Sequence, residues 1–118
     1  MSARIAPKDA AWRTSGTDAL ARALLAVKTP DEMRRFLRDL LTEGEIVEFG
    51  KRWQAACMLA DGVPYLEIVA ATGLSSATVA RVQQWRLRGE GGYRRILERT
   101  HHGHHRHTPR SSRAAGRA

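Results

Sequence analysis

The sequence predicts an all-α protein of about six helices, and three observations support this fold class. Apolar residues recur at the three- and four-residue spacing of helix faces along residues 17–100. Sequences typical of capped helix starts divide this stretch at several points. The alternation of apolar and polar residues between hairpin turns, which is typical of strands, is not sustained anywhere.

The N-terminal region combines an expected flexible arm with a first helix. Residues 1–14 contain a proline and little periodicity, and we expect them to be flexible. Leu20 and Leu24 then begin a helical apolar face, and Thr17 with Asp18 is typical of a helix start. A folded domain is therefore expected over residues 15–100.

The second helix has a sharper start. Thr29, Pro30 and Glu32 provide an N-cap hydroxyl, a proline at the first helical position and the glutamate of a capping box. The apolar residues that follow fall on one face: Met33, Phe36, Leu37, Leu40 and Leu41.

A third, longer helix is predicted after the run from Thr42 to Glu45, which repeats the capping-box pattern. Its expected buried stripe is Ile46, Phe49, Gly50, Trp53, Ala56, Cys57 and Ala60. The run from Asp61 to Pro64 ends it. Cys57 is the only cysteine, so an internal disulfide is excluded, and its place on the stripe favours a small buried hydrophobe.

Residues 64–87 predict a helix-turn-helix. Pro64 begins a short helix, Gly73 provides a residue that tolerates positive φ at a sharp turn, and Ser75 is a good N-cap for the next helix. The expected inner face of the first helix is Leu66, Ile68 and Val69, and that of the second is Val79, Val82 and Trp85.

The second of these helices is the predicted DNA-binding element. Its first turn bears small and hydroxyl side chains, which allow close approach to base edges and hydrogen bonds to bases or phosphates. The candidate DNA contacts are Ser75, Ser76, Ala77, Thr78, Ala80, Arg81, Gln84, Arg86 and Arg88. The alternative interpretation is a plain helical hairpin whose arginine-rich face is only solvated.

The charge distribution agrees with binding to a polyanion. The 118 residues include 20 Lys and Arg against 12 Asp and Glu, which gives a formal net charge of +8. Residues 101–118 hold four arginines and no acidic residue, and the stretch Arg81–Arg99 holds six arginines and two glutamates. Basic charge therefore gathers at the C-terminal end of the predicted domain and just beyond it.

Several other protein classes are not expected. The sequence has no apolar run long enough for a transmembrane helix and no apolar region of a signal peptide near its start, so we expect a soluble cytoplasmic protein. All histidines lie at residues 101–107, where no base is held beside a nucleophile, and no phosphate-binding glycine motif occurs. An enzyme is therefore not expected.

Residues 101–118 are rich in histidine and arginine, and we expect them to be disordered. Neutral imidazoles bind Zn²⁺, Ni²⁺ or Cu²⁺. The candidate ligands are His101, His102, His104, His105 and His107. The alternative function is thus a metal-binding protein whose helical domain is a dimerisation platform, whereas the simpler interpretation is a basic tail that adds phosphate contacts.

Several runs occur in order and at matching spacing: Leu40–Glu45, Gly50–Arg52, Met58–Gly62, Thr72–Val82 and Gly89–Tyr93. Together they resemble the Trp repressor superfamily, most closely its YerC/YecD-type branch. The resemblance implies a sequence-specific DNA-binding transcriptional regulator, a repressor, that is an intertwined all-helical homodimer reading successive major grooves of double-stranded DNA. It also implies candidates for the dimer core: Leu20, Leu24, Phe36, Leu37, Leu40, Phe49 and Trp53. A monomeric bundle with the same residues inside is equally compatible with the periodicity.

The resemblance also raises the question of a co-repressor. Arg52 and Arg81 match the two arginines that flank tryptophan in tryptophan-responsive repressors. Val82 and Trp85, however, are bulky where small residues form the indole slot of those proteins. We therefore expect no tryptophan co-repression and no cofactor, with Arg52 paired to Glu48 and Arg81 at phosphate. A ligand other than tryptophan at Arg52 and Arg81 is the alternative.

Overall fold

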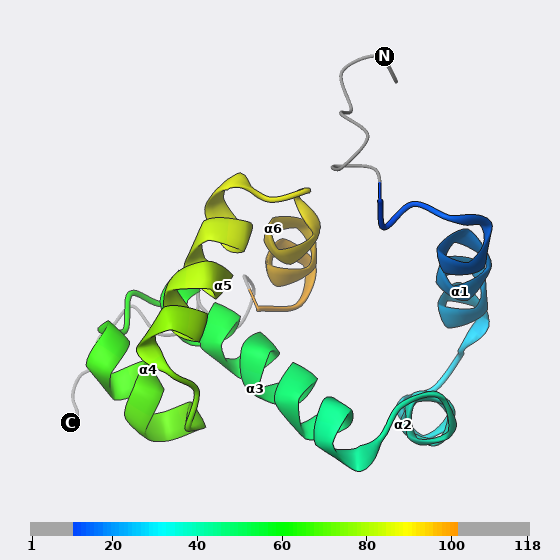
Figure 1. The fold of residues 1–118 in the computed structure, drawn as a ribbon, viewed down its shortest axis with the longest axis horizontal. Helices are drawn as coiled ribbons and strands as arrows, with labels where there is room; N and C mark the ends of the chain where they lie inside the picture. Colours follow the sequence, from blue (N-terminus) through cyan, green and yellow to red (C-terminus); the bar gives the residue numbers. More distant parts are fainter. Residues whose placement is uncertain (1–10, 102–118) are drawn as a thin grey trace. The chain divides into compact units, whose positions relative to one another are not determined.

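The structure is a computed structural model that describes residues 11–101. These residues form helices and connecting turns without a strand, as the sequence predicts (Figure 1). The chain divides into two compact units, Met1–Glu43 and Gly44–Ala118, which are described separately. Residues 1–10 and 102–118 lie outside the described residues, so the expectations of a flexible arm and a disordered tail stay untested there.

The first unit begins with α1, Ser15–Ala26. The predicted start at Thr17 is wrong, because Thr14 is the N-cap and Thr17 is the third helical residue. The two threonines form a reciprocal capping box: the Thr17 amide donates to Thr14 Oγ1 over 3.0 Å, and the Thr14 amide donates to Thr17 Oγ1 over 2.9 Å. A hydroxyl thus replaces the usual glutamate of the box.

The second helix of this unit is α2, Pro30–Leu40. Its predicted start is confirmed, since Thr29 Oγ1 accepts a hydrogen bond of 3.0 Å from the Glu32 amide. The Glu32 carboxylate reaches one residue further back than a capping box requires and accepts from the Lys28 amide over 2.8 Å. Neither α1 nor α2 contains a buried residue.

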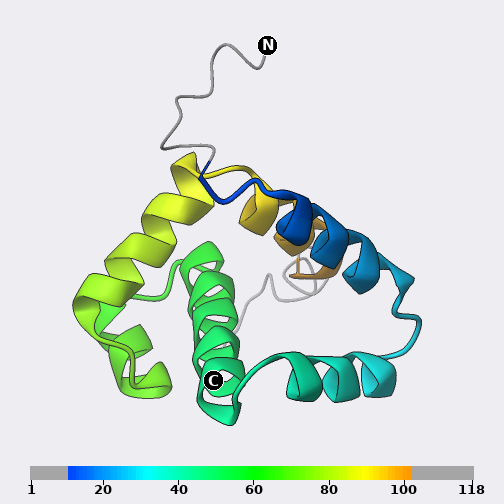
Figure 2. The same cartoon turned by 45° about the vertical axis from the view of Figure 1, so that its right-hand side comes forward.

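The second unit carries the core of the described chain. Its elements are α3 (Glu43–Ala60), α4 (Tyr65–Thr72), α5 (Ser76–Arg88), α6 (Gly92–Ile96) and η2, a π-helical turn (Leu97–His101). Figure 2 shows α4 and α5 on one side of α3, joined by a short turn. The buried apolar residues come from α3, α4, the turn, α5 and η2: Ala55, Ala56, Leu59, Ile68, Leu74, Val79, Val82 and Leu97.

The two halves of α3 differ in burial. In the C-terminal half, Ala55, Ala56 and Leu59 are buried in the core. In the N-terminal half, Val47 and Phe49 expose 55% and 46% of their surface. The predicted buried stripe is therefore wrong at Phe49 and Gly50, and it omits Ala55 and Leu59. These three residues form one core cluster with buried residues of α4, α5 and η2, so the core lies at the C-terminal end of α3.

Candidate nucleic-acid interface

The turn between α4 and α5 is held by one glycine and one threonine. Gly73 adopts φ +80°, as predicted, and ends α4 in the left-handed region. Thr72 is 5% exposed, and its hydroxyl donates to the Ile68 carbonyl over 2.8 Å and accepts from the Leu74 amide over 3.1 Å. The sequence interpretation missed Thr72, although a hydroxyl residue just before a glycine turn is a known signal for such a bond.

The start of α5 is fixed by a short network of hydroxyl groups. Ser75 is the N-cap, and its Oγ accepts from the Thr78 amide over 3.1 Å. Ser75 Oγ also donates to Thr78 Oγ1 over 3.0 Å, and Arg81 Nη2 donates to the same Thr78 atom over 3.1 Å. The network holds the Arg81 guanidinium close to the N-terminal turn of the helix.

The outer face of α5 is a stripe of four residues, Ala77, Arg81, Gln84 and Arg88. Their spacing of four, three and four places them in one row along the helix, and all four are exposed. Arg88 Nη1 donates to Gln84 Oε1 over 2.6 Å, so the two long side chains of the distal turn are linked. We refer to these four residues as the outer stripe.

The inner face of α5 carries Val79 and Val82, both completely buried as predicted. The prediction that Trp85 is buried with them is wrong, because it exposes 41% of its surface at the edge of the helix. On α4, Ile68 is completely buried, whereas Leu66 is 82% exposed and not on the inner face as predicted. The apolar spacing therefore predicted both helices correctly, but it assigned too many residues to their buried faces.

The structure does not bring Arg86 to the outer stripe. Arg86 lies seven residues after the buried Val79 and therefore on the same side of α5. Its Nε donates to Gln83 Oε1 over 2.9 Å in a partly buried position. The remaining predicted contacts, Ser75, Ser76, Thr78 and Ala80, lie at or near the N-terminal end of the helix.

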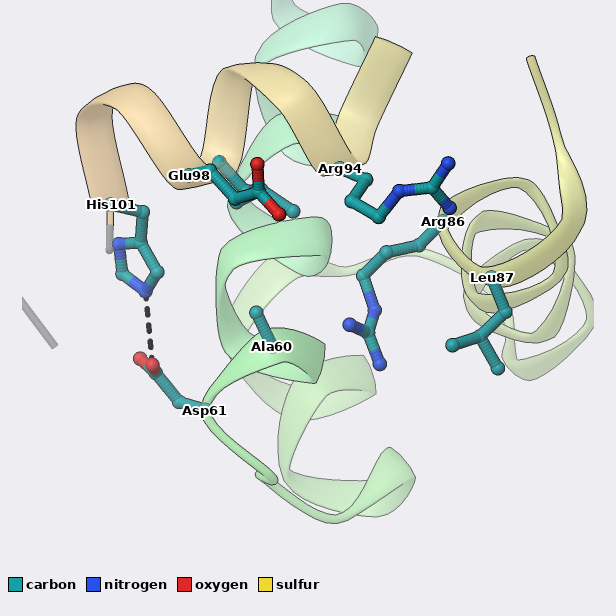
Figure 3. Close-up of a pocket in the computed structure, with 8 residues that line it drawn as sticks. Ala60, Asp61, Arg86, Leu87, Arg94, Glu98 and His101 are labelled. Carbon is teal, nitrogen blue, oxygen red and sulfur yellow. Dashed lines mark hydrogen bonds and ion pairs between the residues drawn. The ribbon is translucent and has the colours of Figure 1, made fainter. Parts of the chain in front are cut away.

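Arg86 instead lines a pocket of about 260 Å³ at the end of α3 (Figure 3). The other lining residues are Ala60, Asp61, Leu87, Arg94, Leu97, Glu98 and His101. Of the predicted histidine ligands, only His101 belongs to the described residues, and its Nε2 lies 3.0 Å from Asp61 Oδ1. Residues 11–101 contain no group of three or more side chains placed to hold a metal ion.

Arg52 on α3 is held by its own neighbours. Its guanidinium carbon lies 5.7 Å from the centre of the Phe49 ring and 5.9 Å from the centre of the Trp85 ring. Its Nε lies 3.7 Å from Glu48 Oε2, which confirms the expected ion pair, although this separation is too long for a hydrogen bond. Arg81 has a different partner, Thr78, so the two arginines are engaged separately.

Aromatic packing continues behind Arg52. Trp53 on α3 stacks on Tyr93 of α6, with ring centres 6.2 Å apart and planes 15° from parallel. Burial raises the pKa of the Tyr93 phenol, and the positive charge of Arg52 opposes this rise. Through Arg52 and Trp53, α3 thus contacts Trp85 of α5 and Tyr93 of α6.

Comparison with known proteins decides the family. The family model for the Trp repressor protein matches residues 15–101, which is most of the chain. The chain belongs to the Trp repressor family. A relative of this Trp repressor-family protein is the uncharacterized protein YerC of Bacillus subtilis (strain 168), 37% identical over 82 residues that cover 70% of this chain and 79% of YerC.

Two crystal structures resemble the fold of this Trp repressor-family protein. A TrpR-like protein from Eubacterium eligens ATCC 27750 has 36% sequence identity and a TM-score of 0.71, over 75% of this chain and 91% of that one. A candidate Trp repressor from Staphylococcus aureus has 34% identity and a TM-score of 0.71, over 75% and 89%. The resemblance stated from sequence motifs is thereby confirmed.

Family membership makes this protein a DNA-binding regulator at the level of the family. The helix-turn-helix expected over residues 64–87 corresponds to α4 and α5. Within residues 11–101, the helices are too short or too polar to cross a membrane.

Proposed function

We propose that this Trp repressor-family protein is a sequence-specific transcriptional repressor that acts as a homodimer and reads the major groove of double-stranded DNA with α5. The observation that carries the proposal is the outer stripe of α5. It presents Ala77, Arg81, Gln84 and Arg88 to solvent on the side opposite the buried valines.

The chemistry of this surface suits a DNA helix. Arginine and glutamine side chains hydrogen-bond the edges of guanine and adenine in the major groove, and alanine packs against thymine methyl groups. The short side chains of Ser75, Ser76 and Ala77 let the start of α5 approach the bases, while its amides and dipole favour phosphate. Residues 76–88 include three arginines and no acidic residue, so nothing on α5 repels the DNA backbone.

The apolar surface outside the core supports the proposal that two copies of the chain form a dimer. Neither α1 nor α2 buries a residue, and a pocket of about 340 Å³ lies between them, lined by Ala23, Ala26, Val27, Glu32 and Phe36. In the second unit, Val47 and Phe49 of α3 are exposed apolar residues as well. In a twofold dimer these residues would be covered, and the two α5 helices would meet two half-sites of a palindromic operator.

We further propose that DNA binding needs no free tryptophan. The guanidinium of Arg52 already faces the Trp85 and Phe49 rings and pairs with Glu48. Val82 is completely buried in the core. An aromatic ligand would have to displace the Trp85 indole to stack on Arg52, and Trp85 belongs to the DNA-binding helix itself.

The test of the DNA surface is the substitution Arg81→Ala. We expect its affinity for the selected operator to fall by about 1–3 kcal/mol, or roughly 5- to 150-fold, with the dimer intact. The control is Arg22→Ala, which removes the same charge from an exposed residue of α1 instead of α5. Fluorescence anisotropy at a fixed salt concentration measures both. Equal affinities for the Arg81→Ala and Arg22→Ala proteins would show that α5 does not read the operator.

The test of co-repressor independence uses the parent protein with and without millimolar L-tryptophan. We expect the same operator affinity in both, within the error of the anisotropy titration. A gain of tenfold or more on adding L-tryptophan would contradict the proposal that Trp85 fills the space beside Arg52.

A further inference from the structure

Lys51 of α3 places its ammonium group beside the turn between α4 and α5. A Cβ built on Gly73 would lie 3.8 Å from Lys51 Nζ, so the charge lies next to the glycine that ends α4. Lys51 is partly buried, which is typical of a lysine whose methylene stem packs on the fold while its charged end reaches solvent. The turn itself, residues 73–75, has no charged side chain, so its nearby charge comes from another helix.

The Lys51 ammonium has no partner within residues 11–101. It forms neither a hydrogen bond nor an ion pair there. Glu48, the acidic residue one helical turn before it, pairs with Arg52 instead. Residues 68–89, which include the turn and all of α5, contain no Asp or Glu. The charge of Lys51 is therefore not neutralised by its own helix or by the segment that it faces.

The position of this charge matters because of how a helix-turn-helix lies on DNA. The second helix enters the major groove with its N-terminal residues at the base edges, and the first helix crosses the backbone. Gly73 comes two residues before Ser75, the N-cap of α5. In the proposed mode of binding, the Lys51 ammonium would therefore lie at the edge of the groove, close to the backbone phosphates. A lysine is a compact charge with three rotatable donors, which suits a phosphate.

We propose that Lys51 binds a backbone phosphate of double-stranded DNA beside the α4–α5 turn and so helps to fix how α5 enters the groove. This inference rests on the proposed function, because it takes α5 as the helix that reads DNA. It adds a residue of α3, outside the helix-turn-helix, to the DNA-binding surface. Phosphate contacts carry no direct sequence information. Lys51 would therefore contribute affinity and orientation, whereas the outer stripe would determine which sequence is bound.

A purely structural role for Lys51 predicts a different result. A cation near the C-terminal end of α4 would stabilise the negative end of the helix dipole. Loss of that interaction would lower the stability of the fold, but it would not change the number of counterions that DNA releases when the protein binds. A phosphate contact does change that number. The salt dependence of DNA binding therefore separates the two roles.

The test is the salt dependence of DNA binding by the full-length Lys51→Gln protein. Fluorescence anisotropy measures its affinity for the selected operator and for an unrelated duplex between about 0.05 and 0.2 M KCl. The control is Lys28→Gln, which removes the same charge from an exposed lysine between α1 and α2. Lys51→Arg keeps a positive charge at the tested position. Urea unfolding measures the stability of each variant.

We expect Lys51→Gln to lose about five- to tenfold in affinity near 0.1 M salt for each protomer bound, equally on both duplexes. The slope of log K against log salt concentration should become shallower by about 1 for each protomer. Lys28→Gln and Lys51→Arg should keep the parent slope. A parent slope in Lys51→Gln, with or without a loss of stability, would overturn the proposal.

The unrelated duplex distinguishes failure of this inference from failure of the proposed function. A shallower slope for Lys51→Gln in a protein that prefers no DNA sequence would support the Lys51 contact and contradict sequence reading by α5. An unchanged slope for Lys51→Gln, together with weaker operator binding by Arg81→Ala, would reject the Lys51 contact alone. A parent protein that binds neither duplex would overturn both proposals.

Discussion

Both units of the chain consist of amphipathic helices, but they differ in how far their apolar side chains are buried. In the second unit, α3, α4, α5 and η2 enclose a core in which Ile68, Val79 and Val82 are completely buried. In the first unit, α1 and α2 also carry apolar residues at helical spacing, but no residue of either helix is fully buried. A single chain therefore buries apolar side chains of the second unit, but it does not fully bury any side chain of α1 or α2.

This difference separates the functions of the two units. A helix-turn-helix with its own core holds α5 in a defined orientation, which sequence reading requires. Helices whose apolar stripes are only partly covered are suited to pack against another chain, because burial of that surface is the main favourable term in association. In the proposed dimer, the first unit therefore contributes to the dimer interface, and the second unit carries the DNA-binding surface.

The largest expected effect comes from breaking the core of the second unit. Val82→Asp would place an unpaired carboxylate at a completely buried position, and we expect the free energy of unfolding to fall by at least about 3 kcal/mol. Ala77→Asp is the control on the exposed side of the same helix and should change stability by less than about 1 kcal/mol. Urea unfolding at one protein concentration, followed by circular dichroism, measures both. A cooperative parent-like transition for Val82→Asp would refute this core.

The next effect concerns the exposed apolar surface of the first unit. Leu25 on α1 and Leu66 on α4 are 86% and 82% exposed, so in a monomer a charge at either site would cost little. In the proposed dimer, Leu25→Glu would put a charge into the interface, and we expect at least tenfold weaker dimerisation. Leu66→Glu should leave dimerisation unchanged. Sedimentation equilibrium distinguishes the two, and identical behaviour of the variants would argue against α1 in the interface.

A smaller effect is expected at the start of α5. Ser75→Ala removes the hydroxyl that accepts from the Thr78 amide, and the loss of such a cap costs about 1 kcal/mol of stability. Ser76→Ala removes the neighbouring hydroxyl, which is exposed and is not the N-cap, and should cost less than about 0.5 kcal/mol. Thermal unfolding of both variants provides the measurement. If Ser76→Ala were the more destabilising change, the assignment of the cap would be wrong.

The smallest effect concerns Cys57, a partly buried residue that packs against the core of the second unit. Burial, and to a lesser degree the charge of Asp61, raises the pKa of its thiol. The folded state therefore favours the protonated thiol, and this contribution to stability is present at neutral pH and is lost as the pH rises through the raised pKa. We expect slower alkylation by iodoacetamide at pH 8 in the native protein than in urea. Equal rates in the two states would contradict the burial of this thiol.

The parts of the fold that local chemistry determines could be predicted from the sequence. Thr29 and Ser75 are caps because a hydroxyl beside free helix amides satisfies them wherever the helix packs, and Gly73 is the residue that tolerates the left-handed turn. The start of α1 was missed because a threonine, Thr17, takes the role that glutamate usually has in a capping box.

Burial depends on which neighbours cover a residue, and periodicity does not contain that information. Phe49, Leu66 and Trp85 have the correct spacing for an inner face, yet all three are substantially exposed in this chain. Arg86 was grouped with the DNA contacts because of its charge, although its seven-residue spacing from Val79 already indicates the inner side of α5. The position of a residue around the helix, counted from the buried Val79, therefore predicts the outer stripe better than the charge of its side chain does.

The most direct test of the central claim is selection of bound fragments from random double-stranded DNA by the purified full-length protein. Two α5 helices related by a twofold axis predict a palindromic consensus, with half-site centres about one helical turn of DNA apart. The same selection with Arg81→Ala should lose enrichment within the half-sites. Enrichment of no sequence, or of a single half-site without symmetry, would contradict a homodimer that reads DNA with the outer stripe.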